Sequence, residues 1–247
     1  MQDVAKELIE KIDRNLFERF HDARAFALNA RLSSSFPSEN SPPNKHSSPN
    51  KNLEEYLEKL ITDHKIYSHI LVFTPQGDLV AQNRMDVFGE EIKPIESKSE
   101  KVLLKQWFNN VLNESYLKPL SPNPAFPELG TVVYGPHASL FGQQTVRDEQ
   151  FDMMFATAIK NDSGEVTGVW VNVLDFKFLE EIFLEYHLSL LMKGYNNVQL
   201  LLVDQKDDVL IDIRSKDNQA MDYFWENSEL KAQNIDLKNN GYDCRRS

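Results

Sequence analysis

The sequence holds few side chains in patterns that could perform catalysis or bind a metal. Its six histidines form no His-Glu-x-x-His run, and no spacing of His and Cys suggests a zinc site. Neither a Gly-x-Ser-x-Gly nucleophile pattern nor a Gly-x-x-x-x-Gly-Lys-Ser/Thr phosphate loop occurs. The acidic stretch 204–208 lacks the alternating ligands and the glycine of a calcium loop, so it fits a solvated hairpin turn better. We therefore expect no enzyme and no metal site, although a Ser/His/Asp triad assembled from distant residues stays open.

A small-molecule pocket is the sharper hypothesis, because such a pocket needs an aromatic wall and a few fixed polar groups. Trp107 and Phe108 lie on a predicted helix, Tyr134 lies in a proline-rich stretch, and Asn172 lies on a predicted strand. Trp170 alternates with Asn172, so both side chains would face the same side of a regular strand. The alternatives are core packing for the aromatic residues and a hydrogen bond to a neighbour for Asn172. No cofactor is implied.

The charge balance and the cysteine count exclude several classes of function. The chain of 247 residues has 27 Lys and Arg against 38 Asp and Glu, a net charge of −11, and no dense basic cluster. It therefore lacks the electrostatic footprint of a nucleic-acid-binding protein. A single cysteine cannot form an internal disulfide. No run of 18 apolar residues and no signal peptide are visible, so the chain is either cytosolic or a piece from between membrane anchors.

A long N-terminal helix and a polar loop are predicted first. Residues 1–32 carry apolar side chains at helical spacing over about eight turns. This length indicates a spine that spans more than one packed unit, or a helix that pairs with a second subunit. In residues 33–52, fifteen of the twenty residues are Ser, Pro or Asn, which predicts a disordered loop.

Three antiparallel hairpins follow, each predicted from two apolar runs joined by turn residues. Their strands are Ile66–Phe73 with Leu79–Asn83, Phe151–Ile159 with Val166–Leu174, and Val198–Val203 with Val209–Ile213. Helical periodicity predicts helices at Leu53–His64, Glu100–Asn113 and Phe176–Lys193, whereas Leu117–Pro136, with five prolines, predicts irregular chain. These elements predict a mixed α+β fold with antiparallel sheets.

One structural unit is predicted to occur twice. Leu71–Ala81 overlays Leu201–Ile211 at an offset of 130 without gaps, and a predicted helix precedes each hairpin. We expect a complete unit at residues 53–175. Residues 176–247 would hold a connecting helix and a partial, truncated second copy.

This order of elements resembles the double Cache sensor domain, which places two PAS-like units after a long helix. The stretch from Ile70 to Ala81 is similar to the first hairpin of the membrane-distal unit. Gly164–Val173, followed by Phe178-Leu179, resembles the last distal strands running into the connecting helix. Leu16–Ala27 resembles the helical spine of methyl-accepting receptors.

The resemblance implies a PAS-like, extracytoplasmic (periplasmic) ligand-sensing domain of a bacterial inner-membrane chemoreceptor or sensor histidine kinase. It implies membrane anchors outside this chain, a homodimer through the N-terminal helix, a small-molecule ligand and no catalysis. In the amino-acid-sensing branch, an Arg-x-Trp-Tyr run binds the ligand carboxylate and a later Asp binds its amine. Here these positions read Lys105-Gln106-Trp107-Phe108 and Asn172. An organic acid, an amino acid or a similar metabolite would fit. The alternative is a PAS-like regulatory or dimerisation module, or an enzyme with an unrecognised site.

Overall fold

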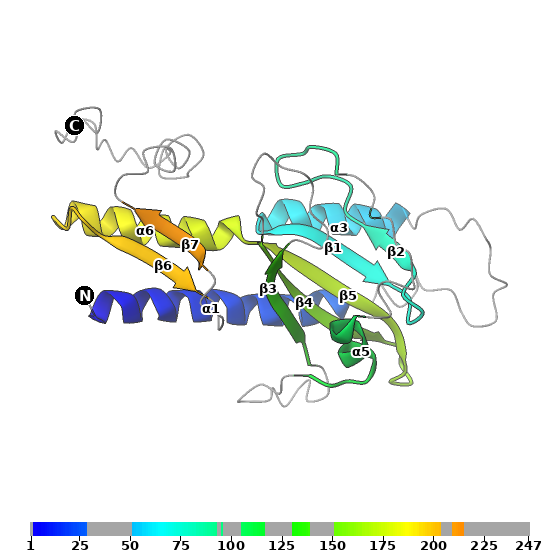
Figure 1. Cartoon of the computed structure of the whole chain (residues 1–247). Coiled ribbons are helices and arrows are strands. Elements are labelled where there is room, and N and C mark those ends of the chain that lie inside the picture. Colours follow the sequence, from blue (N-terminus) through cyan, green and yellow to red (C-terminus); the bar gives the residue numbers. More distant parts are fainter. Residues whose placement is uncertain are drawn as a thin grey trace. The chain divides into compact units, whose positions relative to one another are not determined.

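The computed structural model describes residues 2–28, 51–92, 95, 105–116, 130–138, 151–203 and 209–214. The chain forms two compact units. Asp13–Phe176 is called the sheet unit here, and Met1–Ile12 together with Lys177–Ser247 is called the hairpin unit. The elements, drawn in Figure 1, are α1 (Gln2–Ala27), α3 (Lys51–His64), β1 (Tyr67–Phe73), β2 (Leu79–Gln82), α5 (Gln106–Leu112), β3 (Val132–Ala138), β4 (Phe151–Lys160), β5 (Val166–Asp175), α6 (Lys177–Met192), β6 (Gln199–Val203) and β7 (Val209–Arg214).

The sheet unit contains a five-stranded antiparallel sheet in the order β2-β1-β5-β4-β3. Local turn chemistry fixes its longest hairpin, β4–β5. The Asn161 side-chain oxygen accepts hydrogen bonds from the backbone N–H groups of Ser163 and Glu165. Gly164 takes a φ of +82°, which glycine adopts at little steric cost. The predicted mixed α+β class with antiparallel, PAS-like sheets is therefore confirmed.

The two faces of this sheet carry different layers. One face, called the α5 face here, packs against helix α5 through a single apolar cluster. The sheet residues of that cluster are Leu71, Phe73, Val132, Met154, Ala156, Ala158, Val169, Val171 and Val173. The opposite face, called the α1 face, holds Trp170, whose ring contacts Phe26 of α1 at 6.1 Å and Tyr56 of α3 at 6.3 Å between centroids. The sheet is thus covered by helices on both sides.

One strand lies where irregular chain was predicted. Residues 132–136 belong to β3, which pairs with β4, so the prediction of irregular chain there is wrong. β3 is an edge strand, and an edge position tolerates Pro136 because its missing N–H interrupts no internal ladder. The register shifts between Tyr134 and His137, on either side of that proline.

The remaining predicted elements form with small boundary changes. Helix α1 covers Gln2–Ala27 of the predicted 1–32 spine. Most of the predicted loop 33–52 lies outside the described residues, and α3 begins within it, at Lys51. The helix α5 covers only the second half of the stretch predicted as helix, and residues 100–104 lie outside the described part.

The hairpin unit contains the predicted third hairpin. Strands β6 and β7 pair in antiparallel fashion, and Ile213 packs against Leu184 and Leu188 of helix α6. At the other end of the chain, Lys11 of α1 forms an ion pair with Glu185 of α6. Among the helices that the structure describes, none is long and apolar enough to cross a membrane.

Candidate functional site

The α5 face is organised in rows by cross-strand pairing, since paired residues of antiparallel strands point to the same side. Three rows cross the face: Leu79, Phe73, Val169 and Ala158; then Gln82, Leu71, Val171, Ala156 and Val132; then His69, Val173, Met154 and Tyr134. Two of the positions on β4, the strand beside the central β5, are alanines, Ala156 and Ala158. Both are buried in the cluster that packs against α5.

Helix α5 supplies the aromatic wall of this face. Trp107, Phe108 and Val111 are its buried residues, and they recur at the spacing of one helical side. The Phe108 ring packs edge-to-face on Phe73 at 6.1 Å, and the Trp107 ring lies 5.5 Å from Phe108. Lys105 occupies the N-cap position in an extended conformation, and its side chain is exposed.

The indole N–H of Trp107 is one of several buried polar atoms without an assigned hydrogen-bond partner in the described part of the chain. Trp107 is only 2% exposed, yet its Nε1 has no hydrogen-bond partner among the residues that the structure describes. Leaving a buried donor unpaired costs about 1–3 kcal/mol, so such groups normally have partners. An acceptor atom of a bound molecule would satisfy it.

Polar groups lie at one end of the α5 face, in the row of His69 and beyond it. Asp152 lies two residues before Met154 on the same side of β4, and it is 6% exposed. Burial lowers the pKa of His69 to about 4, so its imidazole is neutral at pH 7. Tyr134 is 37% exposed in the same row. This end therefore offers a carboxylate, a neutral imidazole and a phenol.

The predicted site residues divide between the two faces. Trp107 and Phe108 of α5 and Tyr134 of β3 lie on the α5 face, with Lys105 at the start of the helix. Trp170 and Asn172 do share one side of β5, as predicted, but it is the α1 face. There the Trp170 Nε1 donates a hydrogen bond of 2.7 Å to the Asn172 Oδ1. A single cavity lined by Trp107 and Asn172 together is therefore wrong, because strand alternation points Val171 and Val173 towards α5.

Sequence reasoning missed His69 and Asp152. His69 lies two residues before Leu71 and four before Phe73, so strand alternation alone places it on their side. Asp152 sits near the start of an otherwise apolar strand, where a carboxylate is unusual in a buried position. The alternation of His69 and the buried position of Asp152 can both be recognised in the sequence. Neither indicates which side of the sheet a helix covers.

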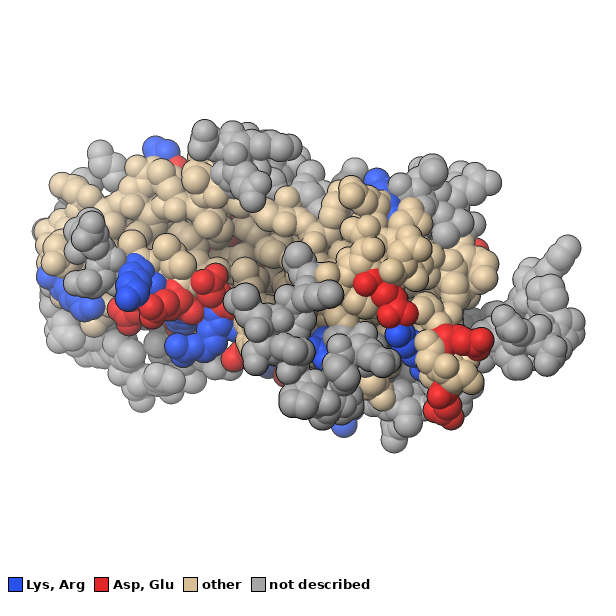
Figure 2. Space-filling view, turned by 90° about the horizontal axis from the view of Figure 1, so that it is seen from below, with Lys and Arg blue, Asp and Glu red and all other residues tan. Residues whose placement is uncertain are grey.

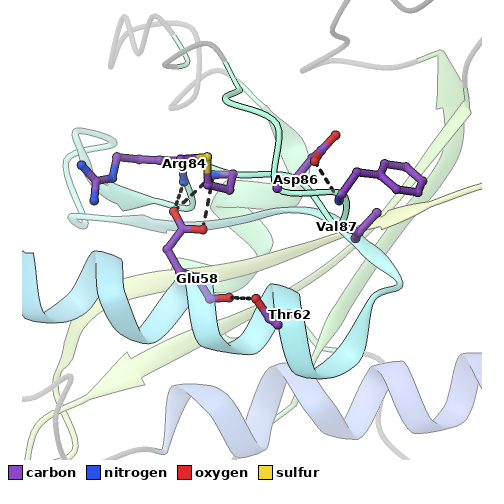
Figure 3. A pocket seen from close by; sticks show the side chains of 8 residues that line it. Glu58, Thr62, Arg84, Asp86 and Val87 are labelled. Atoms are coloured by element: carbon purple, nitrogen blue, oxygen red, sulfur yellow. Dashed lines mark hydrogen bonds between the residues drawn. The ribbon is translucent and has the colours of Figure 1, made fainter.

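A hollow lies beside α3. Glu58 and Thr62 of α3 line it together with residues 84–89, and its volume is about 470 Å³ (Figure 3). The Glu58 carboxylate accepts hydrogen bonds from the backbone N–H groups of Arg84 and Met85, and Asp86 Oδ1 accepts two more from the backbone of its own turn. These carboxylates hold the loop in place through its backbone. We therefore assign no ligand to this hollow.

The charged side chains of the described residues are mixed in sign on the face drawn in Figure 2. Figure 2 shows basic and acidic side chains next to one another, without a broad basic patch on the coloured part of that face. Within the described ranges, no group of three or more His, Cys, Asp or Glu could hold a metal ion.

Comparison with known proteins gives a fold. No protein-family model matches the sequence, and no curated protein matches it. The ligand-binding domain of the Pseudomonas aeruginosa PAO1 amino acid chemoreceptor PctC, solved with GABA, is similar over 85% of this chain and 72% of its own, with 13% identity and a TM-score of 0.51. The ligand-binding domain of the Campylobacter jejuni chemoreceptor Tlp3, solved with L-valine, is similar over 92% of this chain and 77% of its own, with 13% identity and a TM-score of 0.50. The chain therefore has the fold of chemoreceptor sensory domains, as the resemblance to double Cache domains implied.

Proposed function

We propose that this chain is the extracytoplasmic ligand-sensing domain of a bacterial transmembrane receptor, and that it binds a small polar metabolite on the α5 face of the sheet unit. The fold shared with two chemoreceptor ligand-binding domains supports a sensory role. The observation that carries the site is the Trp107 N–H, which is buried in an apolar face without a partner among the described residues.

The polar groups of this face favour a ligand that carries both an acceptor and a positive charge. The Trp107 N–H would donate to the acceptor, and Lys105 at the start of α5 would attract a carboxylate. Asp152 at the other end would supply the carboxylate that an ammonium group pairs with. An amino acid combines these groups, and GABA and L-valine are the ligands named for the two similar domains.

Calorimetry and thermal unfolding of the purified chain with amino acids, amines and carboxylates test this proposal. A ligand at 100 times its Kd should raise the free energy of unfolding by about 2.7 kcal/mol. Trp107→Phe keeps an aromatic ring but removes the N–H, and it should weaken binding about tenfold, the value of one hydrogen bond. Trp170→Phe is the matched control, because it removes a buried indole N–H from the α1 face.

Two results would count against the proposal. One is the absence of any stabilising ligand across the panel with a well-folded chain. The other is a ligand whose affinity responds to Trp170→Phe but not to Trp107→Phe, because the ligand would then bind on the α1 face.

The receptor would act as a homodimer through helix α1. Phe17 is 58% exposed and Leu28 is 46% exposed. They are eleven residues apart, so they lie on nearly the same side of a helix with 3.6 residues per turn. A second copy that packs against this side would bury both. Phe17→Glu should shift the chain to a monomer in analytical ultracentrifugation, and an unchanged sedimentation coefficient would count against this interface.

A further inference from the structure

We propose that the outer edge of strand β6 is an interaction site for a second copy of this chain. The β6 strands of the two copies would pair in antiparallel fashion and join the two β6–β7 hairpins into one continuous sheet. This inference goes beyond ligand sensing, and it does not depend on the α5 face as the ligand-binding face.

The hairpins β1–β2 and β6–β7 have the same register. The pairs on either side of the register shift are Val72–Ala81 and Phe73–Leu79 in the first hairpin, and Leu202–Ile211 and Val203–Val209 in the second. The numbers of these residues differ by 130 at every position. Each hairpin also has its extra residue on the second strand, Val80 in β2 and Leu210 in β7. We therefore take β6 as the counterpart of β1.

The two counterparts differ in what lies at their outer edges. β1 pairs with β2 on one side and with β5 on the other, both in antiparallel fashion. β6 pairs with β7, and within the described part of the chain no strand pairs with its other side. Because alternate residues of a strand direct their N–H and C=O groups to opposite edges, this outer edge of β6 presents donors and acceptors to another strand.

The edge of β6 lacks the features that usually prevent pairing between edge strands, namely charged residues, proline and bulges. β6 reads Gln-Leu-Leu-Leu-Val, and the extra residue of its hairpin lies on β7. By contrast, β7 carries Asp212 and Arg214, and the edge strand β3 of the other sheet carries Pro136. Of these three edge strands, β6 is therefore the one most open to pairing.

The residues of β6 suit pairing with an identical strand. Leu201 pairs with Asp212, next to Ile213 of the α6 side, so Leu201 faces away from α6. Leu201 is 50% exposed and Val203 is 48% exposed. In an antiparallel pair that overlaps all five residues of β6, the central Leu201 lies opposite Leu201 of the other copy. The pairing would bury apolar surface, and no like charges would meet, because the strand has none.

A second copy is the occupant that these features favour. Consecutive strands usually pair with each other, so chain that follows β7 would extend the sheet at β7 and not at β6. An isolated two-stranded hairpin is marginally stable, whereas a sheet of more strands with an apolar face is stable, so the contact would stabilise both hairpins. It is a small contact, and it should form at higher chain concentrations than the α1 contact proposed above.

Analytical ultracentrifugation of the whole chain with Phe17→Glu tests this contact separately from that of α1. In this background, association should appear as the chain concentration is raised. Leu201→Lys should weaken it about tenfold, because an apolar pair is lost and like charges lie opposite each other. Val209→Lys is the matched control, because Val209 is 52% exposed on the same face but lies on β7. Both positions are exposed, so neither lysine should prevent folding.

A mixture of Leu201→Lys and Leu201→Glu chains gives the sharpest result. Each variant alone should associate weakly, and the mixture should recover association, because opposite charges then lie across the pair. In parallel, hydrogen exchange at amides 200–203 should slow as the concentration of the chain without these charges is raised.

The proposal is overturned if the Phe17→Glu chain stays monomeric at every concentration, if Leu201→Lys and Val209→Lys weaken association equally, or if the mixture does not recover it. Protection of amides 200–203 that is independent of concentration would also overturn it, because the edge would then be covered within one chain. Ligand binding on the α5 face is measured separately by calorimetry, so these failures differ from a failure of the proposed function.

Discussion

The protonation of His69 should make the sheet unit less stable in mild acid. His69 is 5% exposed, and burial lowers its pKa from 6.5 to about 4. In the unfolded chain the imidazole binds a proton near pH 6.5, whereas in the folded chain it stays neutral down to about pH 4. Between these values the unfolded state holds the additional proton, so the free energy of unfolding falls as the pH falls.

The size of this effect follows from the shift. One pKa unit corresponds to about 1.4 kcal/mol, so the full difference between the two states is about 3 kcal/mol. Between pH 7 and pH 5 the wild-type chain should lose about 2 kcal/mol through His69 alone. That is a large fraction of the 5–15 kcal/mol by which domains are typically stable.

Urea unfolding at pH 7, 6 and 5, followed by tryptophan fluorescence, measures the effect. Trp107 and Trp170 lie in the sheet unit, so with the third tryptophan removed by Trp225→Phe in every variant the emission reports unfolding of this unit. His69→Gln cannot titrate, and its stability should therefore change less with pH than that of the wild type, whatever its stability at pH 7. If the free energy of unfolding changes with pH in the same way for both proteins, the assignment of a buried, neutral His69 is refuted. The variant His69→Asn shows whether the result depends on the residue that replaces His69.

Three further substitutions test the packing and the turns by chemical denaturation. Phe108→Ala removes a ring that is 0% exposed, and it should cost about 3–5 kcal/mol, whereas a loss below about 1 kcal/mol would contradict its place in the core. Gly164→Ala should cost about 1 kcal/mol through backbone strain alone, because nothing lies within 4 Å of the added carbon; an equal cost at a glycine with negative φ would argue against this reason. Lys11→Ala breaks an exposed ion pair with Glu185 and should change stability by less than about 1 kcal/mol, so a larger loss would show that the pair is more than a surface contact.

The hairpins were predictable because their signals are local. Apolar runs joined by Asn161–Gly164 or by Thr74–Asp78 specify two strands and a turn within about 25 residues, and the strands form there. β3 was missed because its neighbourhood is rich in proline, and proline argues for irregular chain unless the strand is known to lie at an edge. Edge position depends on the order of strands in the sheet, which no local pattern contains.

The division of the candidate site between two faces was less predictable. Residues 168–174 of β5 are buried on both sides, so apolar alternation does not distinguish the side of α5 from the side of α1. The sequence correctly paired Trp170 with Asn172, because residues two apart share a side. Their face depends on where α5 packs, and α5 is separated from β5 by more than 50 residues of chain.

The alternation of β5 also bears on how such a protein could change its specificity. Val169, Val171 and Val173 contact the α5 cluster, whereas Trp170 and Asn172 contact the layer of α1. Substitutions at the odd-numbered positions would remodel the surface where we propose that a ligand binds, and the even-numbered positions that contact the α1 layer would stay intact. If the proposed site is correct, related chains would change the ligand-binding face of β5 while they keep the packing of α1 on its other face. A single-residue deletion within β5 would have the opposite effect, because it would exchange the two sets of side chains and disable both at once.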